Sequence, residues 1–272
     1  MPGTISELRH RDPLLFWIGA AMMLTFIVCV LISIGDTRTI LGLNPWIKPM
    51  KFLVSVTIFL WTVAWFMPET RCQAPMDRGG AWHYRIDKRQ IVRWTIGLAM
   101  IIEIACIILQ SARGAPSHFN TTSMFDTAIF AVMATTIGFN NTAVLILLWI
   151  IRRDTPPHRA GYLWGIRLGV AIFLLACTQG VVIILNNAHT IGAPDGGPGL
   201  PFVNWSTSAG DLRIAHFFGM HALQALPLLG FLLDRSRMPA RNVVFAASFL
   251  WLVVMGALLA TALAGRPVLA AY

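Results

Sequence analysis

Charged residues are scarce in this chain of 272 residues. They make up 12% of the sequence, and only 12 residues are acidic, whereas soluble domains carry roughly 25% charged residues. Hydrophobic residues make up 56%, and the mean hydropathy is +0.67. Because a water-soluble fold cannot hide that much apolar surface, the composition excludes soluble, disordered and collagen-like proteins and indicates a membrane protein.

Cysteine is also rare, and the few cysteines are not spaced for chemistry. Cys29, Cys72, Cys106 and Cys177 form no CxxC pair. The sequence therefore lacks the spacing typical of a zinc ribbon or of covalent haem attachment. Three of the four lie in apolar runs, so we interpret them as small buried hydrophobic residues.

The sequence contains many long apolar runs. Crossing the ~30 Å hydrocarbon layer takes about 20 apolar residues in a helix, and a helix satisfies its own backbone in lipid. The sequence therefore predicts an all-α, polytopic membrane protein with seven transmembrane helices in one domain spanning residues 1–272. The predicted spans are residues 13–35, 50–67, 93–112, 125–151, 162–186, 212–233 and 241–263.

The basic residues predict how the chain sits in the membrane. The net charge is +9, and fifteen of the 21 Lys and Arg residues lie on the side of the N-terminus. Positive charge in short loops stays on the cytoplasmic side. We therefore predict a cytoplasmic N-terminus, an outer C-terminus at Tyr272, location in the inner (plasma) membrane, and lipid rather than nucleic acid as the partner.

Polar side chains inside the predicted spans mark a candidate pocket. An ionisable group in hydrocarbon costs roughly 2.5 to 3.5 kcal/mol on insertion scales, and Glu103 is the only acid well inside a span. At 1.5 Å per residue, Glu103 and His221 come out at similar depth, so we predict that they share a proton. The whole predicted pocket, open to the outer face, consists of Glu103, His221, Asn140, Asn141, Gln179, Gln224, Arg113 and Arg213. For the three middle-helix amides at 140, 141 and 179, hydrogen bonding between helices is the alternative interpretation.

Histidines gather toward the same predicted outer side. The candidate metal or haem ligands are His118, His189, His216, His221, Asp126 and Asp211. A helix histidine and one from a loop or facing helix are the usual axial ligands of a b-type haem in a bundle. Two histidines five residues apart point about 140° apart, so His216 and His221 cannot both bind one iron. Asp211 has a simpler alternative role as a helix N-cap.

A zinc enzyme is a further alternative. In type and order, Ser117, His118, Asp126, His216 and His221 resemble the site of seven-helix zinc hydrolases. That family places its late histidine pair four residues apart, on one helix face, whereas the spacing here is five, which disfavours joint ligation.

Three function classes therefore stay open. Transport or sensing of a small molecule or of protons leads, because a mid-membrane Glu with His and amides suits it. Haem or quinone redox chemistry and metal-dependent hydrolysis are the alternatives, so the cofactor (haem b, zinc or none) and enzymatic activity stay open, as does a purely accessory role. A retinal protein is excluded because the run 241–263 contains no lysine.

Three stretches carry a resemblance to a known group of proteins. They are NPWIKPMKF, QSARGAPSHFN followed by FD, and GDLRIAHFFGMHALQALPL. Together they resemble an uncharacterised family of bacterial inner-membrane proteins, over residues 36 to 234. The resemblance implies a seven-helix fold in the inner membrane and no particular activity.

Overall fold

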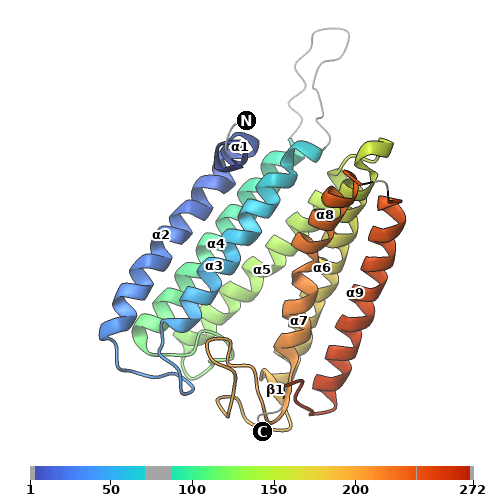
Figure 1. Ribbon diagram of the computed structural model, residues 1–272. Coiled ribbons are helices and arrows are strands. Elements are labelled where there is room, and N and C mark those ends of the chain that lie inside the picture. The colour runs from blue at the N-terminus through green and yellow to red at the C-terminus, as the bar shows by residue number, and fades with distance from the viewer. Residues whose placement is uncertain (1–3, 71–86, 237, 270–272) are drawn as a thin grey trace.

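Seven helices long and apolar enough to cross a membrane are present in the computed structural model, which describes residues 4–70, 87–236 and 238–269 (Figure 1). This confirms the predicted all-α, seven-span architecture. The spans are α2 (Pro13–Gly35), α3 (Ile47–Phe66) with the short η1 (Met67–Glu69), α4 (Lys88–Arg113), α5 (Met124–Ile150), α6 (Ala160–Asn186) preceded by η2 (Pro157–Arg159), the pair α7 (Leu212–Met220) and α8 (Ala222–Leu233), and α9 (Ala240–Leu263). A short helix, α1 (Thr4–Arg11), precedes them.

Local signals in the sequence set the ends of these helices. Asp12 accepts a hydrogen bond from the Leu15 amide at the start of α2, with Pro13 in the first helical position, an arrangement that suits both residue types. Ser123 caps α5 in the same way. Asp211 accepts from the Arg213 amide at the start of α7, which confirms its predicted capping role.

The helix ends differ from the predicted ones by a few residues, and the largest change is at the span predicted at 93–112. This helix begins at Lys88, because Asp87 caps it by accepting from the Arg89 amide. The span predicted at 212–233 has the predicted ends, and the single residue His221 separates α7 from α8 within it. Cys72 and the basic residues at 71, 78 and 85 lie outside the described residues, and so does Arg237.

The helices form two groups that pack mainly within themselves. Helices α2 to α5 make one group and α6 to α9 the other, as Figure 1 shows from left to right. Between the groups, the rings of Phe59 and Phe173 stack with centroids 5.4 Å apart. The Gln224 side chain of α8 donates to the Thr62 hydroxyl of α3 at 3.3 Å.

A row of glycines explains the close contact between α6 and α8. Gly161, Gly165 and Gly169 follow one another at four-residue spacing along α6, and so share one helix face. A Cβ atom added at Gly165 would lie 2.4 Å from the Leu226 carbonyl oxygen, and one at Gly169 would lie 2.6 Å from that of Ala222. Small residues let helix backbones approach closely in membranes, so this face fixes the second group.

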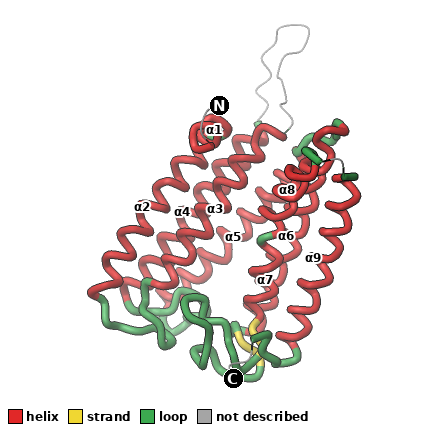
Figure 2. The backbone as a smooth tube through the Cα atoms, viewed as in Figure 1, coloured by secondary structure: helices red, strands yellow, loops and turns green. Residues whose placement is uncertain are grey.

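Three connecting segments meet at one end of the bundle, opposite the N-terminus (Figure 2). We call it the loop end; it comprises residues 36–46, 114–123 and 187–211. The third segment contains β1 (Thr190–Ile191) and β2 (Gly210–Asp211), which pair antiparallel. Asp195 folds this segment by accepting hydrogen bonds from the backbone amides of His189 and Thr190.

Candidate functional site

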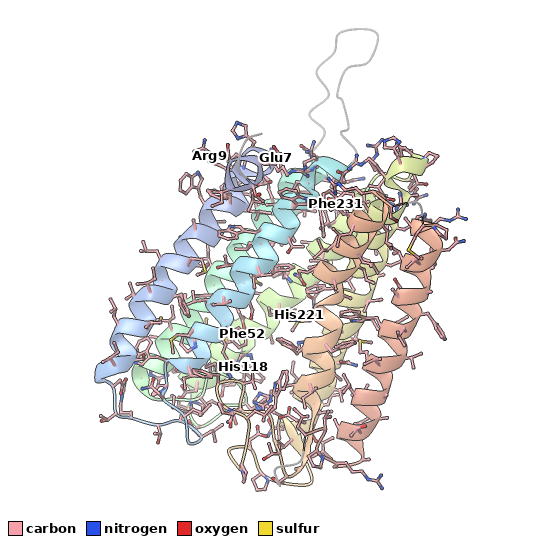
Figure 3. The ribbon with its side chains drawn as sticks, viewed as in Figure 1. Glu7, Arg9, Phe52, His118, His221 and Phe231 are labelled. Atoms are coloured by element: carbon pink, nitrogen blue, oxygen red, sulfur yellow. The ribbon has the colours of Figure 1, made fainter. Side chains whose placement is uncertain are left out.

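Three ionisable side chains from three different segments meet near the loop end. The Lys48 Nζ atom of α3 lies 3.0 Å from Nδ1 of His118. On the other side of the imidazole, Nε2 lies 3.9 Å from Oε1 of Glu103, on α4. We call Lys48, Glu103 and His118 the loop-end triad; Figure 3 labels His118 beside Phe52 of α3.

The fold of the 114–123 segment brings His118 to this position. α4 ends at Gly114, whose left-handed φ of 72° turns the chain away from the helix axis. The Ser117 hydroxyl then lies 3.2 Å from Nδ1 of His118. The imidazole packs among the rings of Phe52, Phe119 and Phe130, with centroids 6.1, 6.2 and 6.3 Å away. This segment therefore returns its histidine toward the helices rather than into solvent.

Glu103 differs from every other buried carboxylate that the structure describes. Its side chain is 3% exposed, Oε2 has no hydrogen-bond partner, and Oε1 has only the imidazole at 3.9 Å. Each of the other four accepts at least one hydrogen bond. They are Asp12 from Leu15, Glu69 from Arg159, Asp126 from Gln110 and Arg113, and Asp211 from Ser206 and Arg213.

The surroundings of His118 keep its imidazole neutral. Burial among protein atoms, followed by the charges of Lys48 and His189, holds the pKa of His118 well below its usual value. A neutral imidazole carries one N–H and one acceptor nitrogen. His118 can therefore accept from one neighbour and donate to the other.

A second layer of charged groups surrounds the triad. The Asp211 carboxylate pairs with Arg213 at 2.5 Å, and the Asp195 carboxylate with Nδ1 of His189 at 2.6 Å. Burial alone would raise the pKa of Asp195, but hydrogen bonds from His189 and Thr190 hold it well below its usual range. The Phe119 ring lies 5.2 Å from that of His189, so two loop-end segments are in contact.

The predicted partnership between Glu103 and His221 needs correction. His221 Nδ1 lies 2.7 Å from the Phe217 carbonyl oxygen, and its ring packs on that of Phe217 at 4.0 Å. Glu103 is instead beside His118. Counting residues along the helices compares only helix side chains, so a partner from a connecting segment was not anticipated.

Most of the remaining pocket residues contact neighbours other than Glu103 and His221. Asn140 and Gln179 are buried with their carbonyl oxygens unpaired, and the Asn140 amide contacts Asn141 at 3.4 Å. Gln224 bonds Thr62 between helices. Arg113 bonds Asp126 at 2.6 Å, and this pair ties the end of α4 to the start of α5.

The candidate ligands for a metal or haem also have other partners. Across the described ranges, no group of three or more His, Cys, Asp or Glu side chains is placed to hold a metal ion. His216 contacts the Ala176 carbonyl oxygen through Nδ1 at 2.8 Å and packs beside Gly180. Asp126 and Asp211 belong to the ion pairs above, so the described geometry lends no support to the zinc or haem alternatives.

Lys48 was not among the predicted pocket residues. It lies in the first turn of α3, after the NPW stretch. The signal that the sequence offered was two lysines three residues apart, Lys48 and Lys51, which lie on one side of a helix.

Comparisons with known proteins leave the family open. No family model, no curated protein and no solved structure matches the chain. The chain is a multi-pass membrane protein by the length and hydropathy of its helices. The resemblance to an inner-membrane family, the inner-membrane location and the orientation all stay predictions.

Proposed function

We propose that this protein handles protons at the loop-end triad, as part of the transport or sensing of a small molecule. The observation that carries the proposal is the Glu103 carboxyl group, buried in a membrane-spanning helix without a hydrogen bond and facing an imidazole and an ammonium. This replaces the predicted pair of Glu103 with His221 by a pair with His118.

The comparison with other buried acids supports a functional role for Glu103. A buried carboxylate that serves the fold is held by hydrogen bonds, because an uncompensated charge in low dielectric is costly. Asp126 and Glu69 follow that rule. Glu103 departs from it, and ionisable groups inside membrane segments typically mark proton or substrate pathways. A carboxyl group that alternates between two protonation states fits this environment.

The order of the three groups defines a route for a proton. Lys48 can donate a proton to Nδ1 of His118, and the imidazole can release the proton on Nε2 to Glu103. The first contact is already a hydrogen bond at 3.0 Å. The second, at 3.9 Å, needs either a rotation of the imidazole or a bridging water. If the proton that reaches Nδ1 and the proton that leaves Nε2 move together, the imidazole stays neutral and only changes its tautomer, so the low pKa of His118 is compatible with this route.

The position between the two helix groups favours transport over a static role. The triad belongs to the α2–α5 group, while His189 and Arg213 border it from the segments around α6 and α7. Transporters commonly place their sites between bundles that move against each other. The transport class therefore accounts for both the chemistry and the location.

Proton movement in liposomes tests the proposal. With a potassium diffusion potential imposed and a pH-sensitive dye inside, wild-type protein is expected to move protons faster than protein-free vesicles. Glu103→Gln should reduce the rate to that of protein-free vesicles. Glu69→Gln is the matched control, since Glu69 is also buried but is bound to Arg159.

Infrared spectroscopy gives a second measurement that needs no ligand. A pH step on the wild-type protein should change a carboxyl C=O band that is absent in Glu103→Gln and present in Glu69→Gln. If Glu103→Gln moves protons like the wild type and retains the band, Glu103 has no part in proton handling.

A further inference from the structure

We propose that the small molecule handled at the loop end is a monocarboxylate, held by Lys48 and Lys51, and that it binds together with a proton on Glu103. This inference rests on the proposed function, because it names the ligand of the same site. The observations that support it are the charges of the side chains around the loop-end triad.

Two ammonium groups at the start of α3 lack a carboxylate partner within the described part of the chain. Lys48 Nζ contacts His118 at 3.0 Å, and Lys51 Nζ contacts the Val203 carbonyl oxygen at 3.4 Å. They are three residues apart, and so they lie on one side of the helix. Both are half-buried, and Lys48 is within electrostatic reach of Lys51.

The neighbouring charges are already paired. Arg213 is bound by Asp211 at 2.5 Å, and Asp195 is bound to His189 at 2.6 Å. Apart from the histidines, the charged groups around this site are three cations and three carboxylates, namely Lys48, Lys51, Arg213, Glu103, Asp195 and Asp211. Their charges balance while Glu103 is ionised. A proton on Glu103 leaves one positive charge in excess, and one bound monoanion removes it. An anion is therefore the class of ligand that would balance the charge of this site.

The aromatic rings narrow the class of anion. Phe52, Phe119 and Phe130 surround the imidazole of His118 and are themselves half-buried. Such rings suit the apolar part of an organic acid better than a fully hydrated inorganic ion, which would lose its water shell there. A carboxylate with a short hydrocarbon part places its charge at the lysines and its apolar end at the rings.

Proton and anion are expected to favour each other's binding. Ionised Glu103 would repel a carboxylate bound at Lys48, and a proton on Glu103 removes that repulsion. Binding of the anion must then promote proton uptake by the same factor, since coupling between two ligands is reciprocal. The buried Oε2 atom without a partner is the place where that proton would reside.

Calorimetry on the purified full chain in a non-ionic detergent tests this inference, with sodium acetate as the probe. Titrations at one pH in two buffers of different ionisation enthalpy should show uptake of about one proton per acetate bound. Lys51→Gln should weaken acetate binding about ten- to a hundredfold, as expected for loss of a hydrogen bond to a charged group. Lys88→Gln, which also removes a first-turn lysine but at the opposite end, should bind acetate like the wild type.

The outcomes separate the two proposals. Absence of acetate binding, equal binding by Lys51→Gln and Lys88→Gln, or tighter binding of inorganic phosphate than of acetate overturns the monocarboxylate inference. If any of these occurs while Glu103→Gln still abolishes proton movement in liposomes, the proposed function stands without this ligand. If acetate binds without proton uptake and Glu103→Gln moves protons normally, the proton-handling proposal fails instead.

Discussion

At the scale of the residue, His118 shows how a side chain of a connecting segment can pack against the ends of the helices. Its side chain is 25% exposed, although it belongs to a connecting segment. Contacts with Lys48 and Ser117 occupy Nδ1, and phenylalanine rings surround the imidazole. These surroundings favour the neutral form, because desolvation and a nearby cation both disfavour a second proton.

The low pKa of His118 predicts how stability changes with pH. In the unfolded chain a histidine takes up a proton near pH 6.5, whereas the folded protein resists protonation there. The unfolded state thus binds more protons below about pH 6.5, and stability must fall as the pH is lowered through that value. We expect the melting temperature in detergent to drop between about pH 7.5 and pH 5.5, with the decline beginning near the unfolded histidine pKa and continuing toward lower pH.

Substitution of His118 should flatten this profile. His118→Gln removes the titrating group, so its melting temperature should depend less on pH over the same range. His10→Gln is the control, because His10 is an exposed histidine on α1. A wild-type profile that is flat, or that is flattened equally by both substitutions, would contradict the assignment. Asp195 does not interfere, since a carboxyl group with a lowered pKa loses its stabilising effect only at more acidic pH.

At the scale of the element, the contact between α6 and α8 depends on what is missing from α6. The face formed by Gly161, Gly165 and Gly169 has no side chains, and carbonyl groups of α8 fill that space. Not every helix glycine has such a role. Gly138 on α5 has no atom within 4 Å of the position where a Cβ would be.

This contrast predicts opposite effects of the same substitution. Gly165→Ala places a methyl group 2.4 Å from the Leu226 carbonyl oxygen, so the helices must separate, at a cost of about 1–3 kcal/mol. Gly138→Ala should be neutral or stabilising by up to about 1 kcal/mol, because alanine favours the helix. Thermal unfolding of both variants in the same detergent measures the difference. Equal melting temperatures would mean that this close approach is not important for stability.

The same elements show what could be predicted from sequence. The seven spans followed from the length of apolar runs alone, and Asp211 was identifiable as a cap from its residue type and position. The partner of Glu103 was not identifiable, because counting residues to estimate depth compares only side chains on helices. His118 lies beyond the turn at Gly114, in a connecting segment, and no local pattern specifies the path of the 114–123 segment.

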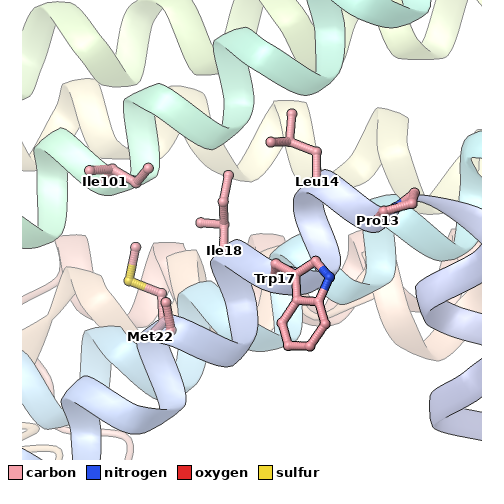
Figure 4. A pocket seen from close by; sticks show the side chains of 7 residues that line it. Pro13, Leu14, Trp17, Ile18, Met22 and Ile101 are labelled. Atoms are coloured by element: carbon pink, nitrogen blue, oxygen red, sulfur yellow. The ribbon is translucent and has the colours of Figure 1, made fainter.

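At the scale of the whole molecule, the polar and apolar features occupy different places. The loop end collects the triad and the ion pairs around it. The groove of about 460 Å³ between α2 and α4 is lined by apolar side chains only, from Pro13 to Met22 on α2 and Ile101 on α4 (Figure 4). Since both helices are candidate membrane spans, this groove suits lipid chains, whereas the site that we propose lies near the loop end.

The side of the membrane on which the loop end lies determines where its protons and ligand come from. The excess of Lys and Arg on the N-terminal side predicts that the loop end faces outward. Chemical labelling of single cysteines tests this prediction in a variant lacking the four native cysteines. Ser208 at the loop end and Ser236 at the opposite end are both exposed, so Ser208→Cys and Ser236→Cys form a matched pair.

With a membrane-impermeant maleimide on intact cells, Ser208→Cys should be labelled at once, and Ser236→Cys only after the membrane is permeabilised. The reverse pattern would place the triad on the cytoplasmic side. Lys48 and Lys51 would then meet cytoplasmic rather than external carboxylates. The charge balance at the triad would be unchanged, because it depends only on contacts within the protein, so the labelling pattern decides which compartment supplies the proton and the ligand.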